Sequence, residues 1–453
     1  MKGLGECSYG KLPIISSFRL HPSSFPHVPL AVPYWNSETY RGILRALLSG
    51  AIVEGPDVQR LQSSVMATLG VENADLCGSG SLALEIALRA CGVGDGDEVI
   101  IPTFCCTAVV PPVLAVGAVP VLADVGVELN ITAETANAAL TKKTKAIIVP
   151  HLFGNPAEIG AIVDFARDKN IRVIDDAAQA LGTTIDPSTR SPALAGGSCS
   201  GFRPTGVLEG DTALPVGLHG HPVGSFGDAG ILSFGSEKVC FGLGGGVVVY
   251  RNKGIFDNGI KIDLPAARFA PSLRALSSTL LWHRWRRWTL PVLSCFLSSA
   301  DPAALPAPYR VESMANLNAA VAVSLMRTLR ENITARRARV DAYRELLGAE
   351  KGLELIPHRP GSACLTQVVR LLLKRRGEDS ASEIIQALGR AGFEVQGSYV
   401  PIHLLPRYRQ WLRAPLAHAE QVWSDLIELP CEPSVSFAQA DRIAAIVKRA
   451  VNS

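Results

Sequence analysis

The chain has little charge for its length and few signals for metals or disulfides. Only 19% of its 453 residues are charged, and the formal net charge is +3. Its lysines and arginines are dispersed, so no basic footprint for nucleic acid is visible. Its ten cysteines form no C-x-x-C pair and no Cys/His spacing that suits zinc. We therefore expect no metal site, no disulfide framework and a reducing, cytoplasmic location.

Membrane signals are equally sparse. No apolar run is long enough to span a bilayer, and the N-terminal segment lacks the apolar core and cleavage site of a secretory signal. The nearest candidate is 276–297, where tryptophans are mixed with arginines. This segment predicts either an interfacial helix in weak contact with a membrane surface or a packed helical insertion that covers a core or a second subunit.

What the sequence does contain is an α/β pattern that is long enough for two domains. From about residue 75 to 250, short apolar runs alternate with helix-like segments, and apolar residues from 321 to 347 recur at the spacing of one long amphipathic helix. We expect strands at 98–102, 119–123, 146–150, 172–174, 229–234 and 246–250, with helices at 81–90 and 157–169. The expected division is an N-terminal extension (1–34), a large domain (35–254, with a loop insertion at 186–222), a linker with a Trp/Arg-rich helical insertion (255–308) and a small C-terminal domain (309–453).

Three short segments could carry chemistry. Asp175 and Asp176 follow an apolar run, at the strand end where ligands of open α/β sheets bind, although acids there could equally cap a helix. Cys77-Gly78-Ser79-Gly80-Ser81 precedes a helix, and its small residues would let an anion approach the helix N-terminus, although a Ser-capped helix start is the simpler interpretation. Lys238 lies between a strand end and a glycine-rich turn, where its amine could act as a nucleophile or remain a solvated surface group.

The order of these segments is informative. A phosphate cup, an acid at a strand end and a later lysine are the anchors that pyridoxal 5'-phosphate (PLP) requires. The cup would hold the phosphate, the acid would keep the pyridine nitrogen protonated, and the lysine would bind the aldehyde as a Schiff base. The combination therefore predicts a PLP site.

Over roughly residues 30–450 the sequence resembles the DegT/StrS family of sugar aminotransferases, which have fold type I. No single motif is decisive, but their order and spacing are typical of that family. The motifs that carry the resemblance are Val53-Glu54-Gly55-Pro56, Gly78-Ser79-Gly80-Ser81, Gly94 to Pro102, Thr144-Lys145-Ala146-Ile147, His151-Leu152-Phe153-Gly154, Asp175 to Ala180, Ser233-Phe234 with Lys238, and Tyr399-Val400-Pro401-Ile402-His403.

The resemblance implies an α/β fold in which a large domain with a mostly parallel central sheet is joined to a smaller α+β C-terminal domain. It also implies a homodimer. The site residues that it implies are Lys238 for the Schiff base, Asp176 for the pyridine nitrogen, Gln179 beside the ring, Gly80, Ser81 and Ser233 for the phosphate, Cys106 at the ring face, and His403 near the substrate.

The implied reaction is a ping-pong transamination. An amino acid, usually glutamate, would give nitrogen to the cofactor, and a nucleotide-linked keto-sugar would receive it. Two alternatives remain open: a carrier-linked or non-nucleotide acceptor, and a degenerate homologue that binds PLP or a sugar nucleotide in a regulatory or scaffolding role.

Three departures from the family pattern bear on these alternatives. Cys106 stands where an aromatic residue usually stacks on the ring, and Leu243 replaces a glutamate in the glycine-rich turn. Val311 and Ser313 stand where the family has an Asn-x-Arg motif that reaches into a neighbouring subunit's site. The last change puts the partner subunit's contribution in question.

Overall fold

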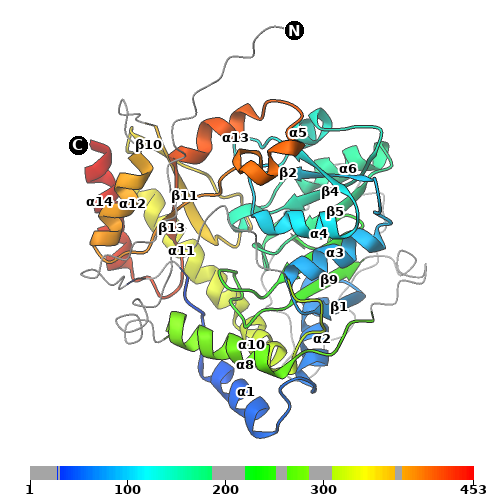
Figure 1. Ribbon diagram of the computed structural model, residues 1–453. Helices are drawn as coiled ribbons and strands as arrows, with labels where there is room; N and C mark the ends of the chain where they lie inside the picture. The colour runs from blue at the N-terminus through cyan, green and yellow to red at the C-terminus, as the bar shows by residue number, and fades with distance from the viewer. Residues whose placement is uncertain are drawn as a thin grey trace.

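The computed structural model describes residues 28, 31–185, 220–250, 263–284, 309–372 and 380–452. Two sheets dominate it: a seven-stranded one on the right of Figure 1 and a four-stranded one on the left, between α11 and the C-terminal helices. The helices run in the order α1 (Ser37–Leu48), α2 (Asp57–Leu69), α3 (Gly80–Ala90), α4 (Val110–Ala115), α5 (Ala133–Ala138), α6 (Ile159–Asp168), α8 (Phe269–Ser278), α10 (Asn316–Arg327), α11 (Leu329–Leu347), α12 (Ser380–Arg390), α13 (Ala417–Val422) and α14 (Phe437–Asn452).

The seven-stranded sheet confirms the predicted, mostly parallel arrangement. Its strand order is β1-β9-β8-β5-β4-β2-β3; the pairs from β8 through β3 are parallel, and β9 pairs antiparallel with both of its neighbours. The strands are β1 (Asn73–Cys77), β2 (Glu98–Pro102), β3 (Val119–Ala123), β4 (Thr144–Pro150), β5 (Arg172–Asp176), β8 (Ala229–Ser233) and β9 (Gly246–Tyr250).

The remaining strands form two smaller sheets. An antiparallel four-stranded sheet has the order β10-β11-β13-β12, and a hairpin joins β6 to β7. These strands are β6 (Thr184–Ile185), β7 (His221–Pro222), β10 (Leu353–Leu355), β11 (Thr366–Leu371), β12 (Gln396–Gly397) and β13 (Leu426–Pro430). Most of the insertion at 186–222 lies outside the described residues, as does 285–308.

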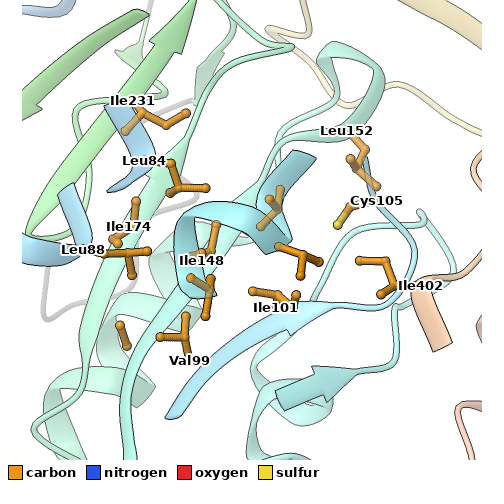
Figure 2. Close-up of a cluster of buried hydrophobic side chains, with 14 of the residues drawn as sticks. Leu84, Leu88, Val99, Ile101, Cys105, Ile148, Leu152, Ile174, Ile231 and Ile402 are labelled. Carbon is orange, nitrogen blue, oxygen red and sulfur yellow. The ribbon is translucent and has the colours of Figure 1, made fainter. Parts of the chain in front are cut away.

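Helix α3 forms where the sequence predicts it. Its segment is rich in strong helix formers, and the Ser79 hydroxyl caps it by accepting a hydrogen bond from the Leu82 N–H at 3.2 Å. Figure 2 shows Leu84 and Leu88 of this helix facing Ile174 and Ile231 of the sheet, all within one buried cluster. This packing holds the first turn of α3 at the carboxyl end of β1.

The prediction of one long helix from 321 to 347 is wrong. The structure has two helices that are interrupted at Thr328, whose φ and ψ of −100° and 10° leave the helical range. The first, α10, packs against α1 and α2, whereas α11 packs against α14 and the small sheet. The start of α11 still shares a core with α10 through Leu329 and Ile333, whereas Val340, Tyr343 and Leu347 belong to the core of the small sheet.

Candidate active site

A cavity of about 490 Å³ opens at the carboxyl edge of the large sheet. The ends of β4, β5 and β8, the loop after β2 and the first turn of α3 all line it, as expected for a site in an open α/β sheet. The predicted site residues that line this cavity are Gly80, Ser81, Cys106, Asp176, Gln179, Ser233 and Lys238.

The predicted phosphate cup, Cys77–Ser81, is a capped helix start whose free backbone N–H groups could also receive an anion. Beyond the bond to Ser79, the first N–H groups of α3 have no helical acceptor and face the cavity. A Cβ at Gly80 would lie 2.9 Å from Oγ of Ser233, so a side chain there would fill the cup. Oγ of Ser233 accepts a hydrogen bond from the Gly235 N–H at 3.3 Å and keeps its own proton to donate.

Both carboxylate oxygens of Asp175 accept hydrogen bonds from within the protein. Its Oδ1 accepts a hydrogen bond from Nε2 of His151 at 2.7 Å, and its Oδ2 accepts from the N–H groups of Gly224 (2.7 Å) and Phe226 (2.9 Å). Nδ1 of His151 accepts from the Ala157 N–H at 2.9 Å, so the imidazole proton is on Nε2. This carboxylate is therefore a structural group, and neither acid caps a helix because both belong to β5.

Asp176 differs from its neighbour. It is 6% exposed, and Oδ1 accepts a hydrogen bond from the Ala178 N–H at 3.0 Å, while Oδ2 has no donor among the described residues. Burial raises the pKa of this carboxyl, and the Ala178 N–H and the Lys238 charge oppose that rise. A buried carboxylate with an open oxygen needs a cationic or N–H partner, such as a protonated pyridine nitrogen.

Gln179 is held in one orientation beside Asp176. Its Oε1 accepts from the Phe153 N–H at 3.0 Å, and its Nε2 donates to the hydroxyl of Tyr399 at 2.8 Å. The Tyr399 ring stacks on Phe153 with centroids 5.9 Å apart. The second N–H of the amide is left for a ligand, so a ring hydroxyl could be bound there. Tyr399 was visible in the sequence only as a family motif, with no role attached.

Lys238 enters the cavity from a strained turn. Glu237, the residue before it, has a positive φ of 61°, which side-chain-bearing residues rarely adopt. The loop is closed by hydrogen bonds from the Phe234 N–H to the Gly245 carbonyl (2.9 Å) and from the Gly244 N–H to the Phe234 carbonyl (3.0 Å). Within the described part of the chain, the Lys238 amine makes no hydrogen bond or ion pair, so it is available for covalent chemistry.

The structure locates each of the departures. Leu243 is 4% exposed; it packs against the core beneath the turn and also lines the cavity. Cys106 lines the cavity, as predicted. Val311 is 56% exposed, and the Ser313 hydroxyl accepts a hydrogen bond from the Ala267 N–H at 3.0 Å.

His403 is placed apart from these residues. It is buried and does not line the cavity; its Nδ1 lies 2.7 Å from Oγ of Thr103, and its Nε2 lies 3.0 Å from Oε1 of Glu420. Burial lowers the pKa of this imidazole, and Glu420 partly offsets that effect. These bonds join the C-terminal part of the chain to the loop that carries Cys106. The predicted approach of His403 to substrate stays a prediction.

The cavity residues fit PLP. Gly80 leaves space beside Ser233 that a side chain would occupy, Asp176 has an open oxygen that could face the ring nitrogen, and the Lys238 amine has no partner among the described residues. Among the described residues, no group of three or more His, Cys, Asp or Glu side chains could hold a metal ion. No helix in that same part of the chain combines the length and apolar character that crossing a bilayer requires.

Comparison with known proteins agrees with this geometry. The model of the DegT/DnrJ/EryC1/StrS aminotransferase family matches residues 34–448. The chain is 26% identical to GDP-perosamine synthase of Caulobacter vibrioides over 93% of this chain and 98% of that protein. It is 36% identical to UDP-N-acetyl-3-dehydro-alpha-D-glucosamine 3-aminotransferase of Acidithiobacillus ferrooxidans over 47% and 49% of the two chains.

Solved structures confirm the fold. PseC of Helicobacter pylori, an aminotransferase, superposes with a TM-score of 0.70 at 17% identity over 94% of this chain and 99% of that one. The predicted fold type I architecture is thereby confirmed, as is the prediction of a PLP-dependent aminotransferase. The chain belongs to the DegT/DnrJ/EryC1/StrS aminotransferase family.

Proposed function

We propose that this enzyme transfers an amino group from an amino acid, glutamate in the first instance, to a nucleotide-linked keto-sugar. The observation that carries the proposal is the meeting, in one cavity, of the cup, the open oxygen of Asp176 and the free amine of Lys238. The named relatives support the acceptor class, because one makes GDP-perosamine and another aminates a UDP-linked dehydro-sugar.

Each residue has a defined task in this proposal. PLP, when bound, supplies an electron-withdrawing ring that carries nitrogen between the two substrates. The N–H groups of Gly80 and Ser81 and the Ser233 hydroxyl bind the phosphate, while Asp176 keeps the ring nitrogen protonated. Lys238 would hold the cofactor through its amine, and the free amine would move a proton at the reacting substrate carbon.

The test uses the absorption of the purified protein with PLP. Covalent attachment should give a visible band, glutamate should bleach it, and the right nucleotide keto-sugar should restore it. If no band forms, the degenerate, non-catalytic alternative is favoured. If the band bleaches and only a carrier-linked keto compound restores it, the nucleotide acceptor is wrong. A panel of GDP-, UDP- and dTDP-linked keto-sugars identifies the acceptor.

We also propose that the protein is a homodimer located in the cytoplasm. Leu44, Leu47 and Leu48 are 56%, 37% and 80% exposed on α1, at the bottom of Figure 1, and form an apolar stripe that a second copy would cover. Light scattering after size-exclusion chromatography should give twice the chain mass. Leu44→Asp combined with Leu48→Asp should shift it to the monomer if this stripe is the interface. A wild-type monomer would contradict the proposal.

A further inference from the structure

The cavity contains a cation that the reaction described above leaves unused. We propose that Arg310 recognises the diphosphate of the nucleotide-linked substrate within its own subunit, at a rim completed by α8. This inference rests on the proposed function and names the side chain that recognises the acceptor substrate.

The backbone fixes Arg310 beside the cup. Both Tyr309 and Arg310 line the cavity, and the Gly78 N–H donates to the Glu312 carbonyl at 2.8 Å. A Cβ at Gly78 would lie 2.9 Å from that carbonyl oxygen and 3.3 Å from the carbonyl oxygen of Arg310. The segment that carries Arg310 is therefore pressed against the loop that opens α3. This contact is within one chain, unlike the Asn-x-Arg motif expected from a neighbouring subunit.

The charge of Arg310 is only partly neutralised. Its nearest acid among the described residues is Glu312, whose Oε1 lies 3.8 Å from NH1 of Arg310. The other oxygen of Glu312 is bound at 2.8 Å by Nε of Arg268, a side chain that is 69% exposed. Arg268 is thus the closer counter-ion of this buried carboxylate, and the Arg310 guanidinium keeps donors for an external anion.

The position of Arg310 favours a diphosphate over a smaller anion. Its side chain is 34% exposed, so it lies where the cavity meets solvent. In a nucleotide-linked sugar the sugar must reach Lys238, so the diphosphate and the nucleoside lie behind it, toward solvent. The diphosphate between them then lies at the mouth of the cavity. A guanidinium donates two parallel hydrogen bonds that match phosphate oxygens.

Helix α8 completes the same rim and belongs to the insertion whose role the sequence left open. Ala275, Ser278 and Thr279 line the cavity, and they present small or hydroxyl-bearing side chains to it. The helix is anchored by Leu276, which is 7% exposed and packs into the core that also contains Leu317. Two hydroxyl groups, of Ser278 and Thr279, therefore lie on the same cavity wall as the Arg310 side chain.

The experiment compares Arg310→Gln with Arg274→Gln, which removes an exposed guanidinium of α8 that does not line the cavity. Binding of UDP, GDP and dTDP to the PLP-loaded enzyme is measured by calorimetry, and the two half-reactions are followed separately by absorption. Arg310→Gln should weaken the best-bound nucleoside diphosphate about tenfold to a hundredfold. Arg310→Lys should lie between, because a lysine cannot make the paired contact. Arg274→Gln should bind as the unmodified enzyme does.

Glutamate bleaching and PLP affinity should be unchanged in Arg310→Gln. A rise in the glutamate KM would assign the arginine to the donor carboxylate, and a loss of PLP affinity would assign it to the cofactor phosphate; either result overturns the proposal. Equal nucleotide binding by all variants, or no binding of any of the three nucleotides by the unmodified enzyme, also overturns it. If glutamate fails to bleach the unmodified enzyme, the proposed transamination is wrong, but the binding comparison still decides the role of Arg310.

Discussion

Two regions of this molecule contain charged side chains that are largely withdrawn from solvent. In one region their hydrogen-bonding groups are all used, and in the other some are left without partners among the described residues. Between α11 and the end of β13, Arg336 is 1% exposed, and each of its nitrogens is bonded. Nε donates to Asn332 (2.9 Å), NH1 donates to the Leu365 carbonyl (2.9 Å), and NH2 donates to Glu432 (2.7 Å). In the cavity, by contrast, Asp176, Lys238 and Arg310 all keep hydrogen-bonding capacity that the described residues do not use.

The difference separates groups that hold the fold from groups that await a ligand. A buried charge without partners costs several kcal/mol, so an open one persists only where something else satisfies it or where function requires it. Asp175 and Asp176 show the contrast within one dipeptide: the first accepts hydrogen bonds on both oxygens and the second on one. Burial alone would not have distinguished them.

Lys238→Ala should produce the largest loss. Without the amine, covalent attachment of PLP is impossible, and proton transfer should slow by roughly 10²–10⁴-fold. The melting temperature should hardly change, because the amine has no described partner to lose. Absorption, borohydride reduction with peptide mapping, and turnover measure these effects, and Lys169→Ala on the surface serves as the control. A reducible adduct on another lysine would refute the assignment.

Asp176→Asn and Asp175→Asn should fail in different ways. Asp176→Asn should lower turnover by about 10²–10³-fold, because a neutral amide no longer holds the proton on the ring nitrogen. Its stability should be kept or slightly increased. Asp175→Asn should lose about 2–3 kcal/mol of unfolding free energy, because His151 and the buried N–H groups lose a charged acceptor. Urea denaturation and steady-state kinetics on both variants make the comparison, and equal turnover would remove the distinction.

Arg336→Met should be the most destabilising change away from the cavity. Removal of the guanidinium leaves Glu432 buried without its cation, at a cost of about 3–5 kcal/mol. Adding Glu432→Leu should recover much of that loss, because the pair is then replaced by apolar groups. Arg344→Met is the control: its 2.6 Å pair with Asp341 is exposed on both sides, and its loss should cost at most about 1 kcal/mol. Urea denaturation of the single and double variants measures these differences.

Much of the fold could be predicted because many of its strands and helices are indicated by short stretches of sequence. Buried parallel strands read as short apolar runs, so β2 and β3 were predicted to the residue. The break at Thr328 could not be predicted, because the apolar spacing continues through it. The break accompanies a change of packing partner, from α1 and α2 for α10 to α14 for most of α11. Such a change depends on contacts between segments that are distant in sequence.

The candidate site divides in the same way. The cup, Asp176 and Lys238 each follow a strand or begin a helix, and their order alone suggested a cofactor. Arg310 carried no local signal, because it reaches the cavity only through the contact between Gly78 and Glu312. The motif of His403 suggested the substrate site; the fold places its side chain against Thr103 and Glu420, and its approach to substrate stays a prediction.

The smallest expected effect is at Glu428. This buried carboxyl has some hydrogen-bond contacts but lacks the complete set that Arg336 has. It lies on β13 near Glu432 but has no arginine; Gln396 and Thr366 contact it at 3.3 and 3.5 Å. Burial raises the pKa of this carboxyl from 4.5 to about 7. The native state therefore keeps a proton that the unfolded chain releases, so stability should fall as the pH rises from about 4.5 to about 7.

Glu428→Gln removes this titration while keeping the shape and one donor of the protonated acid. Relative to the unmodified enzyme, the variant should gain about 1–3 kcal/mol of unfolding free energy at pH 8 over that at pH 5, as judged by urea denaturation at both values. Glu383→Gln, on the exposed face of α12, should show no such gain. If Glu428→Gln gains nothing, the carboxyl is ionised and satisfied at neutral pH. Weak contacts at 3.3–3.5 Å would then be enough to hold a buried charge, and the open oxygen of Asp176 would be a weaker sign of a ligand.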